Sequence, residues 1–523
     1  MKRLRLRAIH LAPLLAIAAL LGWAFASPVG ASPDDDFHLV STWCASGDEL
    51  CEETPVDGVR EVPTALVQVP CYAAQEKESA ACQSAIDFSV TATETTSRGN
   101  FNSEYPPVFY AVMGLFAGDD IIASALTMRV VSVLIFVALT SVTFALLPAS
   151  RRQTLTLMWL ATTLPMGAFL IASNNPSGWA IAGVGTGWIA LLGYLEGHGR
   201  RKWALGAMFA LSALMAAGSR GDAALYMLVA IGAVFLLTVP KLGKGADRKA
   251  FIAYGRDAIL PAAVAVLCVI LFFSSRQAAT GLTGFGPPTA APGGVGEDIV
   301  PVEAKEGLTL ALSNLLHLPL LWAGNFGEWG LGWFDTVLPP TVLLASIAAL
   351  SVTVFVGLGR TWGRKLLVVG LAGAAMVLVP IFVLQQGGNV VGEQVQPRYV
   401  LPIIILFVGL SLLSRRESVL RLTRTQAFVL GIGLVAAFFV SMRTNMRRYI
   451  TGVDVRTFSL DVSIEWWWDL ALSPNAVWIG ASLAYAALVA ILLVEVRAPV
   501  DEPAVPAPDP APAPYSERGK VAA

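Results

Sequence analysis

Three consecutive aspartates, Asp34, Asp35 and Asp36, lie near the N-terminus and are followed by His38. They come directly after an apolar stretch, which would place them at the surface of a membrane. A carboxylate held at that boundary could act as a general base or ligate a metal ion. The alternative is a solvated loop whose negative charge faces the aqueous phase. We take Asp34 and Asp35 as the candidate catalytic residues and assign no metal ligands, although a divalent cation is one cofactor that such carboxylates could hold.

Arginines supply the opposite charge in two places. Arg398 would lie where an apolar span begins, and Arg447 and Arg448 follow the end of another span, with Arg443 close by. A guanidinium is well suited to clamp a phosphate. The alternative for Arg398 is an interfacial arginine that reaches toward lipid head groups. An anionic head group or a lipid-linked phosphate would be a suitable partner for the second cluster.

Two aromatic-rich segments could contact a membrane interface or a ligand. Residues 106–117 follow Tyr105, begin with two prolines and are too short to span a bilayer, so we expect an interfacial helix there. Its anchors would be the aromatic residues Tyr105, Phe109 and Tyr110. Residues 325–335 interleave aromatics with glycine, which suits either an interfacial belt or a platform for the C–H face of a sugar.

The composition indicates which elements must position these residues. Of 523 residues, 55% are hydrophobic and 14% are charged, and the mean hydropathy is +0.65. Soluble domains carry about 25% charged residues. The apolar residues occur in runs long enough to cross about 30 Å of hydrocarbon as helices, which pair their backbone groups internally. The net charge of −1 gives no sign of a nucleic-acid partner.

We therefore predict an all-α integral membrane protein with about twelve transmembrane helices. The predicted spans are residues 8–27, 124–147, 154–172, 177–196, 203–218, 223–239, 258–274, 337–357, 366–384, 400–413, 427–442 and 475–494. The short segments between them are basic, so the positive-inside rule makes them cytoplasmic. This topology places both termini in the cytoplasm. The long loops, 28–105, 275–336 and 443–474, then lie outside a bacterial plasma membrane.

The chain divides into six parts. Residues 1–27 form an N-terminal signal-anchor helix, for which a cleaved signal peptide is the alternative. Residues 28–123 form the first extracytoplasmic loop with its interfacial helix, and residues 124–274 hold transmembrane helices 2–7. The remaining parts are a second large extracytoplasmic loop at 275–336, transmembrane helices 8–12 at 337–494, and a disordered Pro/Ala-rich cytoplasmic tail at 495–523. Within the second loop, we expect residues 307–323 to form a re-entrant or interfacial helix.

Four of the five cysteines lie in the first long loop. An exported loop with Cys44, Cys51, Cys71 and Cys82 favours two disulfides, for which three pairings are open. A metal site is the alternative, although the spacing contains no tight Cys-x-x-Cys pair. The loop therefore belongs on the oxidising side of the membrane.

Four short motifs occur in order within residues 10–495. They are Pro33-Asp34-Asp35-Asp36-Phe37-His38, Pro106-Pro107-Val108-Phe109-Tyr110, Gly332-Trp333-Phe334-Asp335-Thr336-Val337-Leu338-Pro339 and Gln396-Pro397-Arg398-Tyr399-Val400-Leu401-Pro402. Their order and placement resemble the GT-C superfamily of multispan glycosyltransferases. The match is closer to a family of bacterial multispan membrane proteins of unassigned function within that superfamily. One departure is Asp35, where that family carries a glutamate, so it stays open whether Asp34 or Asp35 occupies the catalytic place.

The resemblance implies sugar transfer from a polyprenyl-phosphate donor, with inversion at the anomeric carbon. The implied base is an aspartate of the first outer loop, and cations are needed where negative charge develops on the leaving phosphate. The implied substrate-binding residues are His38, Glu104, Tyr110, Asp335, Arg398, Arg447 and Arg448. The acceptor would be an envelope glycan or an exported protein, with membrane lipids as further partners.

Two other functional classes fit a multispan protein. A lipid-linked glycan flippase or transporter would bury ionisable residues within its spans and show internal repeats. This chain has few such charges, since Arg220 and Asp222 fall at a predicted turn and Arg129 near the outer end of a span, and it shows no convincing repeat. A non-catalytic envelope-assembly protein would function without Asp34. Glycosyl transfer is the function we predict, and enzymatic activity itself stays a hypothesis.

Overall fold

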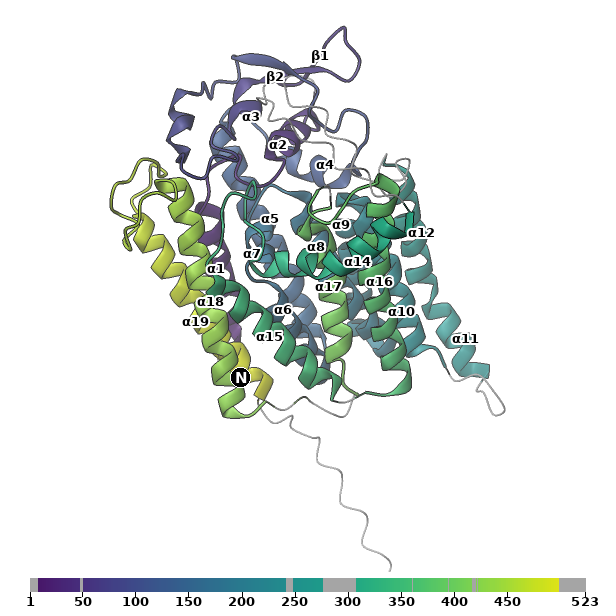
Figure 1. The fold of residues 1–523 in the computed structure, drawn as a ribbon. Helices are drawn as coiled ribbons and strands as arrows, with labels where there is room; N and C mark the ends of the chain where they lie inside the picture. Colours follow the sequence, from purple (N-terminus) through teal and green to yellow (C-terminus); the bar gives the residue numbers. More distant parts are fainter. Residues whose placement is uncertain are drawn as a thin grey trace, which may run out of the picture.

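The computed structural model describes residues 8–47, 50–240, 248–275, 307–359, 361–393, 395–415, 420 and 422–497. The part of the predicted tail from residue 498 on, and residues 276–306 of the second long loop, lie outside the described residues. Figure 1 shows a bundle of long helices with a smaller folded region at one end, where β1, β2 and α2 to α4 lie, while the N-terminus lies at the opposite end.

The long helices of the described chain form the bundle. They are η1 (Ala8–Leu11) with α1 (Ala12–Phe25), α5 (Ile121–Leu146), α8 (Pro176–Glu196), α9 (Gly199–Ser219), α10 (Gly221–Thr238), α11 (Arg248–Asp257) with α12 (Ile259–Phe273), α14 (Gly307–Ala323), α15 (Pro340–Leu358), α16 (Gly363–Gly387), α17 (Pro397–Leu412), α18 (Arg424–Ile450) and α19 (Pro474–Arg497). Within the described ranges, 11 helical runs are long and apolar enough to cross a membrane, and Pro397–Leu412 is a shorter apolar helix. The predicted all-α multispan fold is confirmed.

One predicted span is divided in two. Residues 154–172 were expected to form a continuous helix, but the structure has α6 (Ala149–Thr162) and α7 (Met166–Ile171). Pro165 lies between them, and a proline inside a helix removes a backbone donor and clashes with the preceding turn. The prediction of one uninterrupted helix is therefore wrong, and α7 is a separate short helix.

Helix α14 is long enough to span a membrane, but both of its ends lie at the same end of the bundle. Gln385, at the end of α16, donates a hydrogen bond to Gly307 O at 3.1 Å. Asn325, in η4 (Gly324–Phe326) just after α14, donates to Pro397 O at 2.9 Å, where α17 begins. A short segment connects α16 to α17, so these two contacts are on one side. In Figure 1, α14 runs obliquely across the long helices, in agreement with a re-entrant or interfacial helix.

The region at the end of the bundle, called the head here, comprises residues 26–120. It holds a three-stranded antiparallel sheet in the order β1 (Glu52–Glu53), β2 (Arg60–Pro63), β3 (Thr93–Thr96). Its helices are α2 (Asp35–Cys44), α3 (Thr64–Gln68), η3 (Ala80–Ala85) and α4 (Val108–Gly114). Two disulfides, Cys44–Cys51 and Cys71–Cys82, confirm the prediction and decide the pairing.

Candidate functional site

Asp34 precedes helix α2 in an unusual backbone conformation. Its φ of 61° and ψ of 24° lie in the left-handed region, which aspartate tolerates better than most residues. Its carbonyl accepts the backbone N–H of His38 at 2.9 Å and so starts the helix. The Asp34 side chain makes no capping hydrogen bond. The carboxylate is therefore left to point away from α2.

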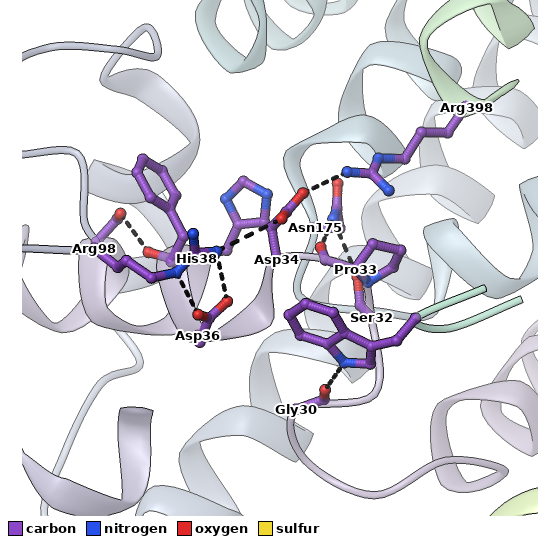
Figure 2. A network of polar contacts seen from close by, with 12 residues as sticks. Gly30, Ser32, Pro33, Asp34, Asp36, His38, Arg98, Asn175 and Arg398 are labelled. Atoms are coloured by element: carbon purple, nitrogen blue, oxygen red, sulfur yellow. Dashed lines mark hydrogen bonds and ion pairs between the residues drawn. The ribbon is translucent and has the colours of Figure 1, made fainter. Parts of the chain in front are cut away.

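The partner of this carboxylate is Arg398, the second residue of α17. Arg398 Nη2 donates to Asp34 Oδ2 at 2.6 Å, and Figure 2 shows the guanidinium reaching the carboxylate from another part of the bundle. The Asp34 side chain is 34% exposed and that of Arg398 is 2% exposed. Nε and Nη1 of Arg398 are buried and have no hydrogen-bond partner among the described residues. Two nitrogens of this guanidinium thus have unused hydrogen-bonding capacity beside a solvent-accessible carboxylate.

A second arginine approaches from the head. Arg98 Nη2 lies 3.6 Å from Asp34 Oδ1, and it donates to Asp36 Oδ1 at 3.0 Å. Its Nε also donates to Asp36 (Figure 2). Burial acts to raise the pKa of Asp34, but the positive charges of Arg398 and Arg98 outweigh it, so the net shift is downward. Asp34 is therefore ionised at neutral pH.

Asp35 lies in a different environment from Asp34. Its side chain is fully buried, and Oδ2 accepts the backbone N–H of Ser32 at 3.1 Å. Burial raises the pKa of Asp35 to about 7, against the opposing charge of Arg129. Arg129 itself donates to the carbonyls of Ser27 and Pro28, after the end of α1. Asp35 therefore holds the loop before α2, whereas Asp34 faces the accessible side.

His38 lies on α2 with one ring nitrogen unused. Nδ1 is 2.9 Å from the hydroxyl of Tyr110, whereas the buried Nε2 has no hydrogen-bond partner within the described chain. Burial lowers the pKa of His38 to about 3, so the imidazole is neutral at physiological pH.

Phe109 and Tyr110 are 1% and 2% exposed. The prediction that these two aromatics anchor an interfacial helix is wrong, because α4 packs that face against α2 and α9.

Sequence reasoning missed Asn175 and gave Arg220 no role in the site. Asn175 Nδ2 donates to Ser32 Oγ at 3.0 Å and to Pro33 O at 2.9 Å, which fixes the backbone just before Asp34 (Figure 2). The sequence pattern around Asn175 gave little indication of a role in the site. Asparagine is common in turns, and Asn175 lies between two apolar helices.

Arg220 lies between α9 and α10 and pairs with Asp222 through Nε at 2.9 Å and Nη2 at 2.7 Å. Its Cζ is 4.2 Å from the ring centroid of Tyr399, and the Cζ of Arg398 is 4.8 Å from that same centroid. Nη1 of Arg220 is buried without a partner among the described residues. A charged pair within an otherwise apolar stretch was the available signal for this residue.

Asp335 and Arg448 form a separate buried ion pair. Arg448 Nη2 lies 2.7 Å from Asp335 Oδ2, and their side chains are 0% and 5% exposed. Arg448 also donates to Tyr72 O at 2.8 Å and to Glu78 O, and Asp335 accepts Ala74 N–H at 3.2 Å. The pair thus fastens one segment of the head to the bundle. It shares no residue with the Asp34–Arg398 pair.

The other two predicted binding residues make local contacts. Arg447 donates to Thr457 O at 3.1 Å and to Ser459 O, in the segment between α18 and α19. Glu104 accepts the backbone N–H of Asn102 at 3.3 Å. Among the described contacts, none joins Arg447 or Glu104 to Asp34.

A tightly packed junction beside Arg398 brings three of the four motifs together. It is formed by Pro33, Met166, Gly330, Gly332, Phe334, Gln396, Pro397 and Arg398. Trp333 of the same glycine-rich segment donates from its indole to Gly30 O at 2.9 Å. The described residues contain no group of three or more His, Cys, Asp or Glu side chains that could hold a metal ion. The arrangement offers an ionised carboxylate, unpaired guanidinium nitrogens and a neutral imidazole.

The comparison with known families covers this site. A family model with the description "Predicted membrane protein (DUF2142)" matches residues 17–407, which is more than half of the 523-residue chain. The matched range includes the head, both disulfides and both members of the Asp34–Arg398 pair. No curated protein matches the chain.

Proposed function

The chain belongs to the family of predicted membrane proteins described as DUF2142, and we propose that it is a glycosyltransferase. It transfers a sugar from a polyprenyl-phosphate donor to an envelope glycan or an exported protein. The observation that carries the proposal is the Asp34–Arg398 contact of 2.6 Å. It supplies the two groups that such a transfer needs, a base for the acceptor and a cation for the leaving phosphate.

Asp34 is the general base in this proposal. Its carboxylate is a third exposed and ionised, so an acceptor hydroxyl can reach it. Asp35 is fully buried and already accepts a backbone N–H. The difference in exposure supports Asp34 rather than Asp35 as the base.

Arg398 binds the departing phosphate. Nη2 holds Asp34, while Nε and Nη1 have no partner within the described chain. Both nitrogens are buried, so donor binding must open the packing around them before a phosphate oxygen can accept from them beside the carboxylate. Arg98, 3.6 Å from Asp34 Oδ1, and Arg220, which contacts the same Tyr399 ring as Arg398, add positive charge around the same centre.

The transfer proceeds by inversion. The acceptor oxygen attacks the anomeric carbon and forms the new glycosidic bond, while its proton passes to Asp34. The bond between the anomeric carbon and the phosphate oxygen breaks, and its electron pair leaves with the lipid phosphate. Arg398 stabilises the charge that develops on that oxygen. Its contact with Asp34 holds the base and the leaving-group cation in fixed relation.

The proposed location is the outer face of a bacterial plasma membrane. Two disulfides in the head favour an oxidising compartment for that end of the bundle. The opposite end carries Arg151, Arg201 and Arg364, near the starts of α6, α9 and α16, as the positive-inside rule expects of the cytoplasmic side. The N-terminus and the end of α19 are then both cytoplasmic.

A reconstitution experiment tests the activity. The purified full-length protein in liposomes is incubated with polyprenyl-phosphate sugars and a crude envelope acceptor, and the free lipid phosphate is quantified. A transferase releases lipid phosphate only when the acceptor is present. Movement of intact donor across the bilayer without its consumption would instead support a flippase and contradict the proposal.

A further inference from the structure

An apolar cavity of about 480 Å³ lies between α1, α5, α6 and α19. Most of its lining is aliphatic or aromatic, with Leu20, Phe136, Trp159 and Tyr485 among the larger side chains. The candidate site does not include it, because Asp34, His38 and Arg398 are absent from its lining. A pocket of this kind inside the membrane-spanning part of a protein suits a hydrocarbon chain.

The charged and imidazole side chains that line the cavity all lie at one end of it. They are His10, Arg152 and Glu495, at the start of α1, the start of α6 and the end of α19. This is the end of the bundle away from the head. The cavity extends along α1 from Ile9 to Leu20, roughly 17 Å at 1.5 Å per residue. That length is about half of the roughly 30 Å hydrocarbon core, or one leaflet.

Arg152 lines the polar end of the cavity, and Arg201 lies close to Arg152. Arg152 Nε donates to Leu147 O at 2.8 Å and to Phe144 O at 2.9 Å, and Arg201 Nε donates to Leu146 O. Both guanidiniums are thereby fixed at the end of α5. With Glu495 as the opposing acid, the three side chains carry a net charge of +1, from two arginines and one glutamate.

We propose that this cavity binds one acyl chain of an anionic phospholipid from the leaflet opposite the head, with the lipid head group against Arg152 and Arg201. The position of the charges distinguishes this lipid from the proposed donor. The donor's phosphate must reach Arg398 at the head end of the bundle. The polar end of the cavity lies at the opposite end of the bundle. The inference therefore does not rest on the proposed transferase activity.

The cavity and the packed junction beside Arg398 share one short helix. Ala168 of α7 lines the cavity, and Met166 of the same helix lies at the junction. A lipid chain in the cavity would therefore support α7 from the side opposite Arg398. Removal of the lipid should lower the thermal stability of the protein.

Native mass spectrometry of the full-length protein tests the proposal. The protein is purified with a delipidating detergent wash, and is then reloaded from nanodiscs that contain equal amounts of phosphatidylglycerol and phosphatidylcholine. Ala16→Phe places a ring in the cavity that Ala16 lines, whereas Ala18→Phe adds the same ring to an exposed position of α1. Arg152→Gln removes one of the two head-group cations, the one that lines the cavity.

The wild-type protein and Ala18→Phe should retain one phosphatidylglycerol, and Ala16→Phe should lose it. Arg152→Gln should show a weaker preference for phosphatidylglycerol than the wild-type protein. Equal lipid retention by Ala16→Phe and Ala18→Phe would overturn the assigned cavity, and equal retention of the two lipids by the wild-type protein would overturn the anionic head group. If Ala16→Phe does not fold, the wild-type and Arg152→Gln measurements still decide the outcome.

Discussion

Arg398 Nη2 lies 2.6 Å from Asp34 Oδ2, although the two residues are 364 positions apart in the chain. The contact joins the start of α17 to the loop that begins α2. Because Arg398 is almost fully buried and Asp34 is a third exposed, the pair presents its carboxylate side to the medium. In the proposed reaction, the charge of Arg398 keeps the Asp34 carboxylate ionised, and the charge of Asp34 holds the Arg398 guanidinium in place.

Replacement of Arg398 should impair transfer through both groups. In Arg398→Ala the leaving phosphate loses its cation, and the pKa of Asp34 rises because burial is opposed by less positive charge. We expect a loss of roughly 100-fold in kcat, with the acid limb of the pH profile moved to higher pH. Arg456→Gln, an exposed arginine between α18 and α19, is the matched control. An unchanged acid limb in Arg398→Ala would show that the pair does not act as a unit.

The stability of the protein should depend on Asp35 in the neutral pH range. Its pKa is about 7 in the folded protein and near 4 in the unfolded chain, so the unfolded chain releases its proton first as the pH rises. As the pH rises from about 4 to about 7, Asp35 therefore lowers the free energy of unfolding, by up to about 4 kcal/mol in total.

Asp35→Asn cannot titrate and should flatten that pH dependence. At pH 8 its Tm should be above that of the wild-type protein, while Asp87→Asn at an exposed position of the head leaves the pH dependence unchanged. Thermal unfolding from pH 5 to pH 8 provides the measurement. Parallel wild-type and Asp35→Asn curves would exclude a buried neutral carboxyl at Asp35.

Arg448 should matter for stability rather than for chemistry. Arg448→Met removes the cation that pairs with the buried Asp335 carboxylate and the donor to two carbonyls, which costs about 3–5 kcal/mol. Loss of the exposed Arg60–Glu53 pair, in Arg60→Gln, should cost at most about 1 kcal/mol. Unfolding and transfer are measured on the same folded samples. A variant of normal stability with a lost kcat would make Arg448 a substrate-binding residue instead.

The Cys71–Cys82 disulfide should stabilise the segment that the Asp335–Arg448 pair holds. It closes a loop with a sequence separation of 11 around Tyr72 and Ala74, for which chain entropy predicts about 3 kcal/mol. The double replacement Cys71→Ser/Cys82→Ser should therefore lower the Tm and expose residues 72–78 to protease. Cys44→Ser/Cys51→Ser is the comparison, and it should leave cleavage at 72–78 unchanged. Equal cleavage in both variants would contradict this local role.

Much of the fold could be predicted from the sequence because hydrophobic length and charge bias act locally. The four cysteines likewise predicted two disulfides. The head sheet could not be predicted, since β1 has two residues and β2 and β3 have four each, too few for an alternating pattern to emerge. The division of residues 154–172 into α6 and α7 depended on Pro165, which hydropathy does not register.

The candidate site was predicted as residues but not as pairs. The sequence singled out two acids and two arginines, Asp34, Asp335, Arg398 and Arg448. Which acid pairs with which arginine depends on the tertiary structure. The structure joins Asp34 to Arg398 and Asp335 to Arg448, and it gives the two pairs different exposure. Phe109 and Tyr110 look the same in a sequence whether they face lipid or protein, which is why their burial was missed.

The separate replacement of Asp34 and Asp35 by asparagine tests the central claim most directly. Each variant is expressed in a strain that lacks the native gene, its protein level is measured, and the envelope glycans are profiled. Asp34→Asn should reduce transfer by at least about 100-fold at a normal protein level, whereas Asp35→Asn should retain it. Normal glycans from Asp34→Asn would contradict the assignment of Asp34 as the general base, and with it the proposed transferase.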